Sequence, residues 1–215
     1  MSDSTPDNAF AETDPAFSKP ALRKALRVTR RAHVDALDPR ILALVLMRPP
    51  TALLSLIPAG AAIGLYGATQ GEAPALGYAR YFHDAGHRIA LPWFAGRDSA
   101  MEFREWDSPH LDELLEPGAY GVPQPAATAP ALIPDVLFVP LVGFTATGGR
   151  LGQGGGHYDR WLSAHPDTIA IGLGWDCQLV DVLPSEAHDR PLHAVITPKR
   201  LYGPFESAVM IGSGA

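Results

Sequence analysis

Residues 135–161 read DVLFVPLVGFTATGGRLGQGGGHYDRW and carry a strand signal, a glycine-rich turn and a helix signal in succession. The apolar run 135–140 is closed by a proline, which predicts a buried strand that ends at Pro140. Six glycines lie between 148 and 156, where the missing Cβ atoms would let a ligand approach the backbone amides. A helix that begins near His157 would add the positive end of its dipole. The segment therefore predicts a phosphate-binding site.

Two common nucleotide motifs do not fit this stretch. No Gly-Lys-Ser/Thr triplet follows the glycines, and His157 stands where a dinucleotide-binding turn needs its third glycine. A flexible loop without a ligand is the alternative for any glycine run. Arg150 and Asp159 at the flanks favour a ligand site, because a guanidinium binds phosphate and a carboxylate can bind a metal ion.

Composition limits the classes of protein to consider. A length of 215 residues favours one domain, and 17 basic against 23 acidic residues give a net charge of −6, which argues against nucleic acid or an anionic membrane as main partner. Cys177 is the single cysteine, so no intrachain disulfide or thiolate cluster is possible. The apolar region 41–66 is broken by Arg48 and three prolines, which predicts core and not a membrane span. Because the first residues are acidic, unlike those of a targeting segment, we expect a cytoplasmic protein.

The pattern along the chain alternates between strand and helix. We expect a disordered acidic arm over 1–17, one domain over 18–205 and a flexible tail over 206–215. Ser18 is a candidate N-cap for a helix with a basic face, which could also be only a solvated face. The alternation predicts an α/β sandwich. Its expected strands are 61–65, 88–91, 101–106, 135–139, 168–174 and 193–197, its other helices are 73–85 and 158–164, and 116–134 is expected to be a long loop.

Residues 150–160, RLGQGGGHYDR, resemble the signature of the 5-formyltetrahydrofolate cyclo-ligases, also called methenyltetrahydrofolate synthetases. The resemblance continues in order along most of the chain. Its further parts are Lys19-x-x-x-Arg23, Gly71-Glu72, Ala90-Leu91-Pro92, Met101-x-Phe103, residues 121–125, Leu183-Pro184 and His188-Asp189.

The resemblance implies a single-domain, three-layer α/β/α sandwich with a mixed, mostly parallel sheet. It implies ATP-dependent closure of 5-formyltetrahydrofolate to 5,10-methenyltetrahydrofolate, with ADP and phosphate released after the formyl oxygen is phosphorylated. Such phosphoryl transfer needs positioning and charge neutralisation and no side-chain nucleophile. Magnesium and a reduced folate, with or without a polyglutamate tail, are then the small-molecule partners, and we expect a monomer.

The family's site residues transfer by position. Lys19 and Arg150 would be catalytic, and Asp159 and Asp189 would hold Mg²⁺. Residues implied to bind ATP are Lys19, Arg23, Arg150, Leu151, Gly152, Gln153, Gly154, Gly155, Gly156, His157 and Tyr158. Those implied to bind the folate are Gly67, Glu72, Gln153, Gly154, Gly155, Gly156 and His157.

Three positions depart from the family pattern: Thr145 stands where an Asp is common, Gln124 where a Glu is common, and His157 where a Tyr is common.

Glu72 could cap the following helix instead of binding the folate. The tyrosines and tryptophans could be core or could stack on a pterin or benzoyl ring, and the sequence does not choose among them. A paralogue acting on another formamide, and a non-catalytic folate- or nucleotide-binding module, remain alternatives.

Overall fold

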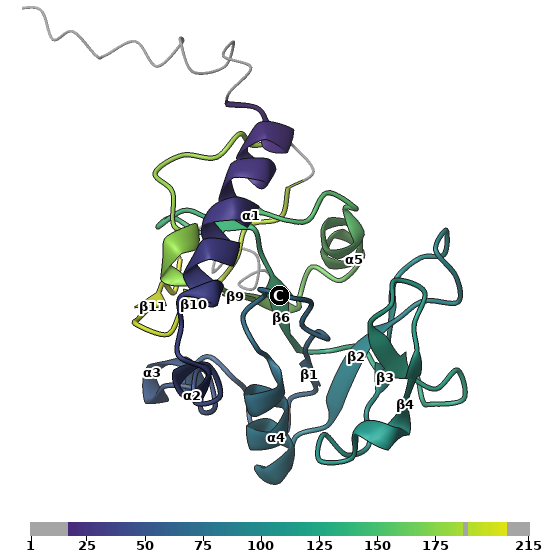
Figure 1. Cartoon of the computed structure of the whole chain (residues 1–215). Coiled ribbons are helices and arrows are strands. Elements are labelled where there is room, and N and C mark those ends of the chain that lie inside the picture. Colours follow the sequence, from purple (N-terminus) through teal and green to yellow (C-terminus); the bar gives the residue numbers. More distant parts are fainter. Residues whose placement is uncertain (1–16, 187–188, 206–215) are drawn as a thin grey trace, which may run out of the picture.

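A mixed sheet of seven strands crosses the centre of the molecule in the order β11-β10-β9-β6-β1-β2-β3 (Figure 1). The computed structural model describes residues 17–186 and 189–205. The five inner strands run parallel, and the two edge strands are antiparallel to their neighbours. The strands are β1 (Ile63–Gly64), β2 (Ile89–Trp93), β3 (Glu102–Glu105), β6 (Val136–Pro140), β9 (Ile169–Leu173), β10 (Ala194–Ile196) and β11 (Leu201–Tyr202). The predicted mixed, mostly parallel sheet is confirmed.

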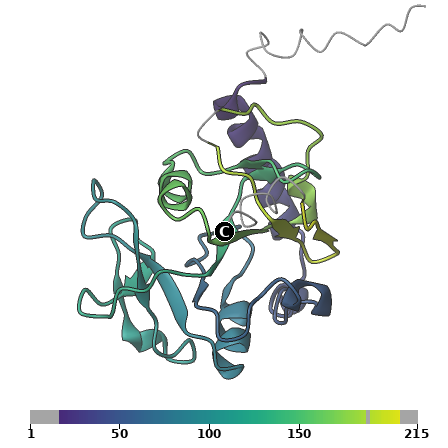
Figure 2. The same ribbon diagram turned by 180° about the vertical axis from the view of Figure 1, so that it is seen from behind.

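Helices cover both faces of this sheet, which makes three layers. Alternate strand residues divide between two core clusters: Phe138 belongs to the cluster that also contains residues of α3 (Thr51–Leu54) and α4 (Leu76–Asp84), and Leu137 to the cluster that contains Trp161 of α5 (His157–Ala164). The long helix α1 (Lys19–Asp35) packs on the α4 side with α2 (Pro39–Leu42). It lies in front of the sheet in Figure 1 and behind it in Figure 2.

Every predicted strand and helix range contains most or all of an element of the predicted type, with bounds that differ by a few residues at the ends. The N-cap at Ser18 is confirmed, because its side chain accepts a hydrogen bond of 3.4 Å from the amide of Ala21. The expected long loop over 116–134 was wrong in part, since β4 (Leu115–Pro117) and β5 (Pro123–Pro125) pair as a hairpin. Prolines can occupy such a two-stranded ribbon where no amide is needed for pairing. The predicted tail, and the arm before Phe17, lie outside the described residues.

The glycine-rich stretch contains a second hairpin, β7 (Gly143–Phe144) with β8 (Arg150–Leu151), which the sequence did not reveal. The described part of the chain also contains two short 3₁₀ turns, η3 (Asp112–Leu114) and η4 (Asp176–Gln178). Among the described residues, no helix is long and apolar enough to cross a membrane.

Strand order determines where a ligand can bind. From β6 the chain continues outward through β9 and β10, whereas β1 and β2 extend in the other direction, so the order reverses between β6 and β1. In open α/β sheets the crevice at the carboxyl ends of strands beside such a reversal is the usual ligand site. Here these ends lead to Pro140 from β6 and to Tyr66 and Gly67 from β1.

Candidate active site

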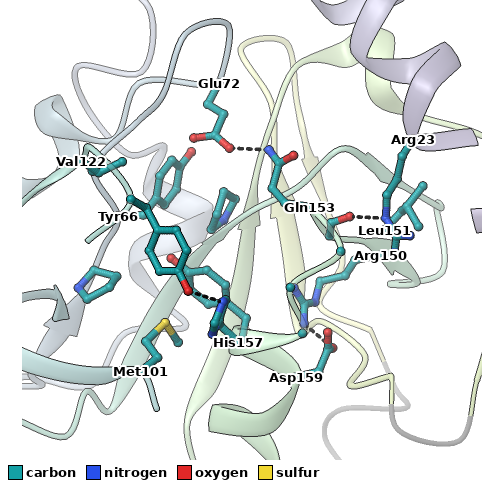
Figure 3. Close-up of a pocket in the computed structure, with 18 of the residues that line it drawn as sticks. Arg23, Tyr66, Glu72, Met101, Val122, Arg150, Leu151, Gln153, His157 and Asp159 are labelled. Atoms are coloured by element: carbon teal, nitrogen blue, oxygen red, sulfur yellow. Dashed lines mark hydrogen bonds and ion pairs between the residues drawn. The ribbon is translucent and has the colours of Figure 1, made fainter. Parts of the chain in front are cut away.

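A cavity of about 640 Å³ opens at this reversal point, and its lining includes Tyr66, Gly67 and Pro140 (Figure 3). The lining also contains every residue that the family resemblance assigned to ATP, folate or metal. These are Lys19, Arg23, Gly67, Glu72, Arg150, Leu151, Gly152, Gln153, Gly154, Gly155, Gly156, His157, Tyr158, Asp159 and Asp189. The structure thus brings together residues from distant parts of the chain, while their individual roles remain predictions.

One wall of the cavity carries cationic side chains paired with carboxylates. The side chain of Arg150 is 3% exposed and forms an ion pair with Asp159, while its Nε has no hydrogen-bond partner among the described residues. Lys19 Nζ lies 2.8 Å from Asp189 Oδ2 and 2.7 Å from Glu186 Oε2. Desolvation by burial lowers the pKa of Lys19, but the bonds to these carboxylates outweigh it and the pKa is raised, so the amine stays charged.

The glycine loop lies beside these cations. Gly154 has φ +109° and Gly156 has φ +63°, which residues with a Cβ rarely adopt, and Gly156 is the N-cap of α5. Arg23 Nε donates a 2.9 Å hydrogen bond to the carbonyl of Gly152, and a Cβ added at Gly154 would lie 3.5 Å from the Arg23 guanidinium. Backbone amides, the positive end of a helix and a cationic side chain therefore meet at one point, an arrangement that binds phosphate.

Glu72 connects the glycine loop to α1. Its Oε1 accepts a 2.6 Å bond from Gln153 Nε2 (Figure 3) and lies 4.0 Å from Arg30 Nη1, and its Oε2 accepts from the amide of Thr69. The alternative role for Glu72, as cap of the next helix, was wrong, because α4 has Ala75 at its N-cap and no side-chain cap bond. Arg27 also binds Gln153, because its Nη2 donates to both the backbone carbonyl and the side-chain oxygen of Gln153.

The opposite wall is aromatic. The rings of Phe94, Tyr120 and His157 contact one another edge to face, with centroids 4.9 to 5.5 Å apart. Among the described residues, Tyr66, Tyr120 and Tyr158 line the cavity, whereas Trp93, Trp106, Trp161 and Trp175 are not part of its lining. An aromatic ligand ring would find stacking partners here, a choice the sequence left open.

His157 is held as a neutral ring. Its Nδ1 lies 3.1 Å from Arg160 Nη2, which can only donate, so the proton belongs on Nε2, 3.3 Å from the Tyr120 hydroxyl. Tyr120 in turn donates to the carbonyl of Arg97. Desolvation by burial, followed by repulsion from Arg160, lowers the pKa of His157. The departure from Tyr at this position thus keeps a neutral, hydrogen-bonding ring.

The other two residues that depart from the family pattern, Gln124 and Thr145, form hydrogen bonds with backbone groups. Gln124 donates to the carbonyl of Phe94 at 3.1 Å and accepts from its amide at 3.2 Å, which anchors the aromatic wall. Thr145 Oγ1 accepts a 3.0 Å bond from the amide of Gly149 and closes the turn before Arg150. Since Thr145 is not part of the cavity lining, its substitution for a carboxylate alters a turn and not the cavity.

Oxygen donors suited to a hard cation are present. The carboxylates of Asp159, Asp189 and Glu186 line the cavity next to Lys19 and Arg150, and carboxylate oxygens are the protein ligands that Mg²⁺ prefers. The donor chemistry therefore fits the ion that the family resemblance implies.

Several lining or supporting residues were missed from sequence: Phe94, Glu186 and the ion-pair partner Arg30. Helical spacing did predict that Arg27, and Arg30 or Arg31, share the basic helix face with Arg23, but the family resemblance assigned only Lys19 and Arg23 to the site. Phe94 and Glu186 carried no local pattern, because loops bring them to the cavity.

Comparisons with known proteins agree with this geometry. Residues 16–198 match the profile of the 5-formyltetrahydrofolate cyclo-ligase family. The 5-formyltetrahydrofolate cyclo-ligase of Escherichia coli K12 is 51% identical over 70 residues, 32% of this chain and 38% of that protein. The cyclo-ligase of Haemophilus influenzae is 37% identical over 91 residues, 40% of this chain and 49% of that protein. The aligned segments thus span half or less of these relatives' lengths.

Solved structures extend the likeness over most of the chain. The 5,10-methenyltetrahydrofolate synthetase of Aquifex aeolicus superposes with a TM-score of 0.67 at 25% identity, covering 86% of this chain and 92% of that one. The synthetase of Mycoplasma pneumoniae gives 0.60 at 22% identity, covering 84% and 99%, and supports the fold alone. By the profile match, which covers most of its length, the chain belongs to the 5-formyltetrahydrofolate cyclo-ligase family.

Proposed function

We propose that the protein uses ATP to convert 5-formyltetrahydrofolate into 5,10-methenyltetrahydrofolate, with release of ADP and phosphate. The observation that carries this proposal is that one cavity combines a phosphate-binding wall, built from Lys19, Arg23, Arg150 and the glycine loop, with an aromatic wall. Between them lies the Glu72–Gln153 pair, which offers donors and acceptors to a polar heterocycle. A nucleotide and a folate would thus meet with their reacting groups adjacent.

The chemistry asks for activation of a poor leaving group. The formyl oxygen attacks the γ-phosphate, the bond from that phosphorus to the bridging oxygen breaks, and ADP leaves. Nitrogen 10 then attacks the formyl carbon and loses its proton, the carbon–oxygen bond breaks, and the departing phosphate carries that proton away. Because no side-chain nucleophile is needed, the protein contributes orientation and positive charge.

Each charged residue has a specific task in this scheme. Arg150, buried with an unpartnered Nε, would donate to the transferring phosphoryl group. Lys19, whose raised pKa keeps it protonated, and Arg23 would bind phosphate oxygens. Asp159 and Asp189 would hold Mg²⁺, which when bound neutralises charge on phosphate oxygens.

The test is appearance of the methenyl chromophore when the full chain is mixed with 5-formyltetrahydrofolate, ATP and Mg²⁺, with each component omitted in turn. Product should require all three. Binding of ATP without product would refute the proposal and favour a binding module, and turnover of only a different formamide would favour a paralogue.

Substitutions then test the residues. Arg150→Lys keeps the charge but loses the planar set of N–H donors of the guanidinium. We expect kcat to fall about 10²–10³-fold, the usual cost of losing one transition-state donor. Asp189→Asn should abolish Mg²⁺-dependent turnover with folding intact. Glu186→Gln removes the other carboxylate partner of Lys19 and is the matched control, with a smaller loss expected because Glu186 is 55% exposed. Near-normal turnover of Asp189→Asn would refute the metal role.

A further inference from the structure

Two histidines and an aspartate gather outside the cavity. His83 and Asp84 end α4, and His110 lies in the segment that follows β3. One ligand atom from each lies within 4.8 Å of the others, and no other group of three or more such residues does so within residues 17–186 and 189–205. The side chains are accessible, with exposed fractions of 34%, 62% and 46%.

This cluster lies at the end of the sheet away from the cavity. α4 ends just before β2, so His83 and Asp84 are near the amino end of β2, whereas the cavity is lined by Pro92 and Phe94 at its carboxyl end. The antiparallel strand β3 returns the chain to that same amino end, where the amide of Trp106 bonds the carbonyl of Ile89. The cluster is therefore separate from the proposed active site.

Hydrogen bonds orient both imidazoles toward the carboxylate. His83 Nε2 lies 3.2 Å from the carbonyl oxygen of Asp107, which can only accept, so in the neutral ring Nε2 carries the proton and Nδ1 the lone pair. That Nδ1 lies 3.5 Å from Asp84 Oδ1. His110 Nε2 approaches the same oxygen at 2.8 Å. For His83 the second ring nitrogen is thus held by a carbonyl, an arrangement common in metal-binding histidines.

The segment that carries His110 is also held in place. Arg80, one turn before Asp84 on α4, donates from Nε to the carbonyl of Pro109 at 3.0 Å. The rings of His83 and His110 pack edge to face with centroids 5.8 Å apart. The ligand atoms are thus presented by a helix end and a segment already tied to that helix, which limits the reorganisation needed for binding.

We propose that His83 Nδ1, Asp84 Oδ1 and His110 Nε2 bind a borderline divalent transition-metal ion of the Zn²⁺ or Ni²⁺ type. Two imidazoles with one carboxylate favour such ions over Mg²⁺ or Ca²⁺, which take oxygen ligands. The exposure of the cluster leaves the remaining coordination positions to water. A bound ion would link the end of α4 to the segment after β3 and raise the thermal stability of the folded chain.

Calorimetric titration of the full chain with Zn²⁺, in a non-chelating buffer with excess Mg²⁺, tests this proposal. The wild-type chain should bind one equivalent that raises the melting temperature. Affinity should fall at least about tenfold in His110→Gln and in Asp84→Asn. Asp107→Asn removes an equal charge from the same surface and His33→Gln removes a histidine elsewhere, so these controls should bind as the wild type does. Thermal unfolding without metal checks that all variants fold.

Nitrogen-15 spectra of the histidine rings identify the ligand atoms independently of the variants. Zn²⁺ should shift Nδ1 of His83 and Nε2 of His110. The proposal is overturned if the wild-type chain binds no Zn²⁺, if binding persists in both cluster variants, or if the shifted resonances belong to other histidines.

Discussion

Replacing Glu72 with glutamine removes one charge from a buried pair and keeps the size of the side chain. The side chains of Arg30 and Glu72 are 8% and 6% exposed, with Arg30 Nη1 4.0 Å from Glu72 Oε1. At that separation two unit charges attract by about 4 kcal/mol at an effective dielectric constant of 20. Removing one partner of a buried pair costs about 3–5 kcal/mol, because the other charge stays buried without compensation. Since glutamine keeps one acceptor oxygen, we expect about 3 kcal/mol.

Urea and thermal unfolding measure this loss, which corresponds to a melting temperature lower by roughly 6–12 °C for a chain of this size. The matched control is Glu105→Gln, which breaks the better-formed pair with Arg88 at 2.7 and 2.8 Å on the surface, where the Arg88 side chain is 55% exposed. An exposed pair should cost under about 1 kcal/mol. The double variant Glu72→Gln/Arg30→Met should recover part of the loss. Equal costs for Glu72→Gln and Glu105→Gln would refute the reasoning from burial.

Three further changes test the site and its supports. Gly154→Ala forces a Cβ onto a residue with φ +109°, so the KM for ATP should rise by about tenfold or more in initial-rate assays, and an unchanged KM would contradict the role of the loop. Thr145→Val removes the acceptor for the amide of Gly149 and should cost about 1 kcal/mol in urea unfolding with kcat retained. The lowered pKa of His157 means that the folded state binds fewer protons than the unfolded state below pH 6.5, so stability should fall as pH drops through that window. His157→Gln should flatten this part of the pH profile of unfolding free energy. An unaltered profile would contradict the assignment of this pH dependence to His157.

Local patterns were sufficient for the elements that place the glycine loop. The apolar run before Pro140 became the buried strand β6, the glycines became a turn with positive φ at Gly154 and Gly156, and the helix began at His157. These features depend on short-range physical chemistry, namely apolar burial, freedom of the backbone and a helix dipole. The roles of Lys19 and Arg150 came from resemblance to a family, because spacing alone could not separate a ligand-binding helix face from a solvated one.

Contacts between distant residues needed the tertiary structure. Two hairpins that close the loops around the cavity were missed, because their strands of two or three residues are stabilised by pairing and not by their own pattern. Likewise, nothing in the sequence near Glu72 indicates that Gln153 donates to it, or that Arg30 lies beside it.

The sequence by itself determined the α/β class, the main strands and helices, and the glycine-rich turn before α5, since periodicity and glycine placement act within a few residues. Only the tertiary structure decided which aromatic rings face the cavity, that Thr145 and Gln124 bond to backbone groups, and that His83, Asp84 and His110 converge. Sheet order and loop path bring such residues together across long sequence separations, and a local sequence pattern does not indicate such contacts.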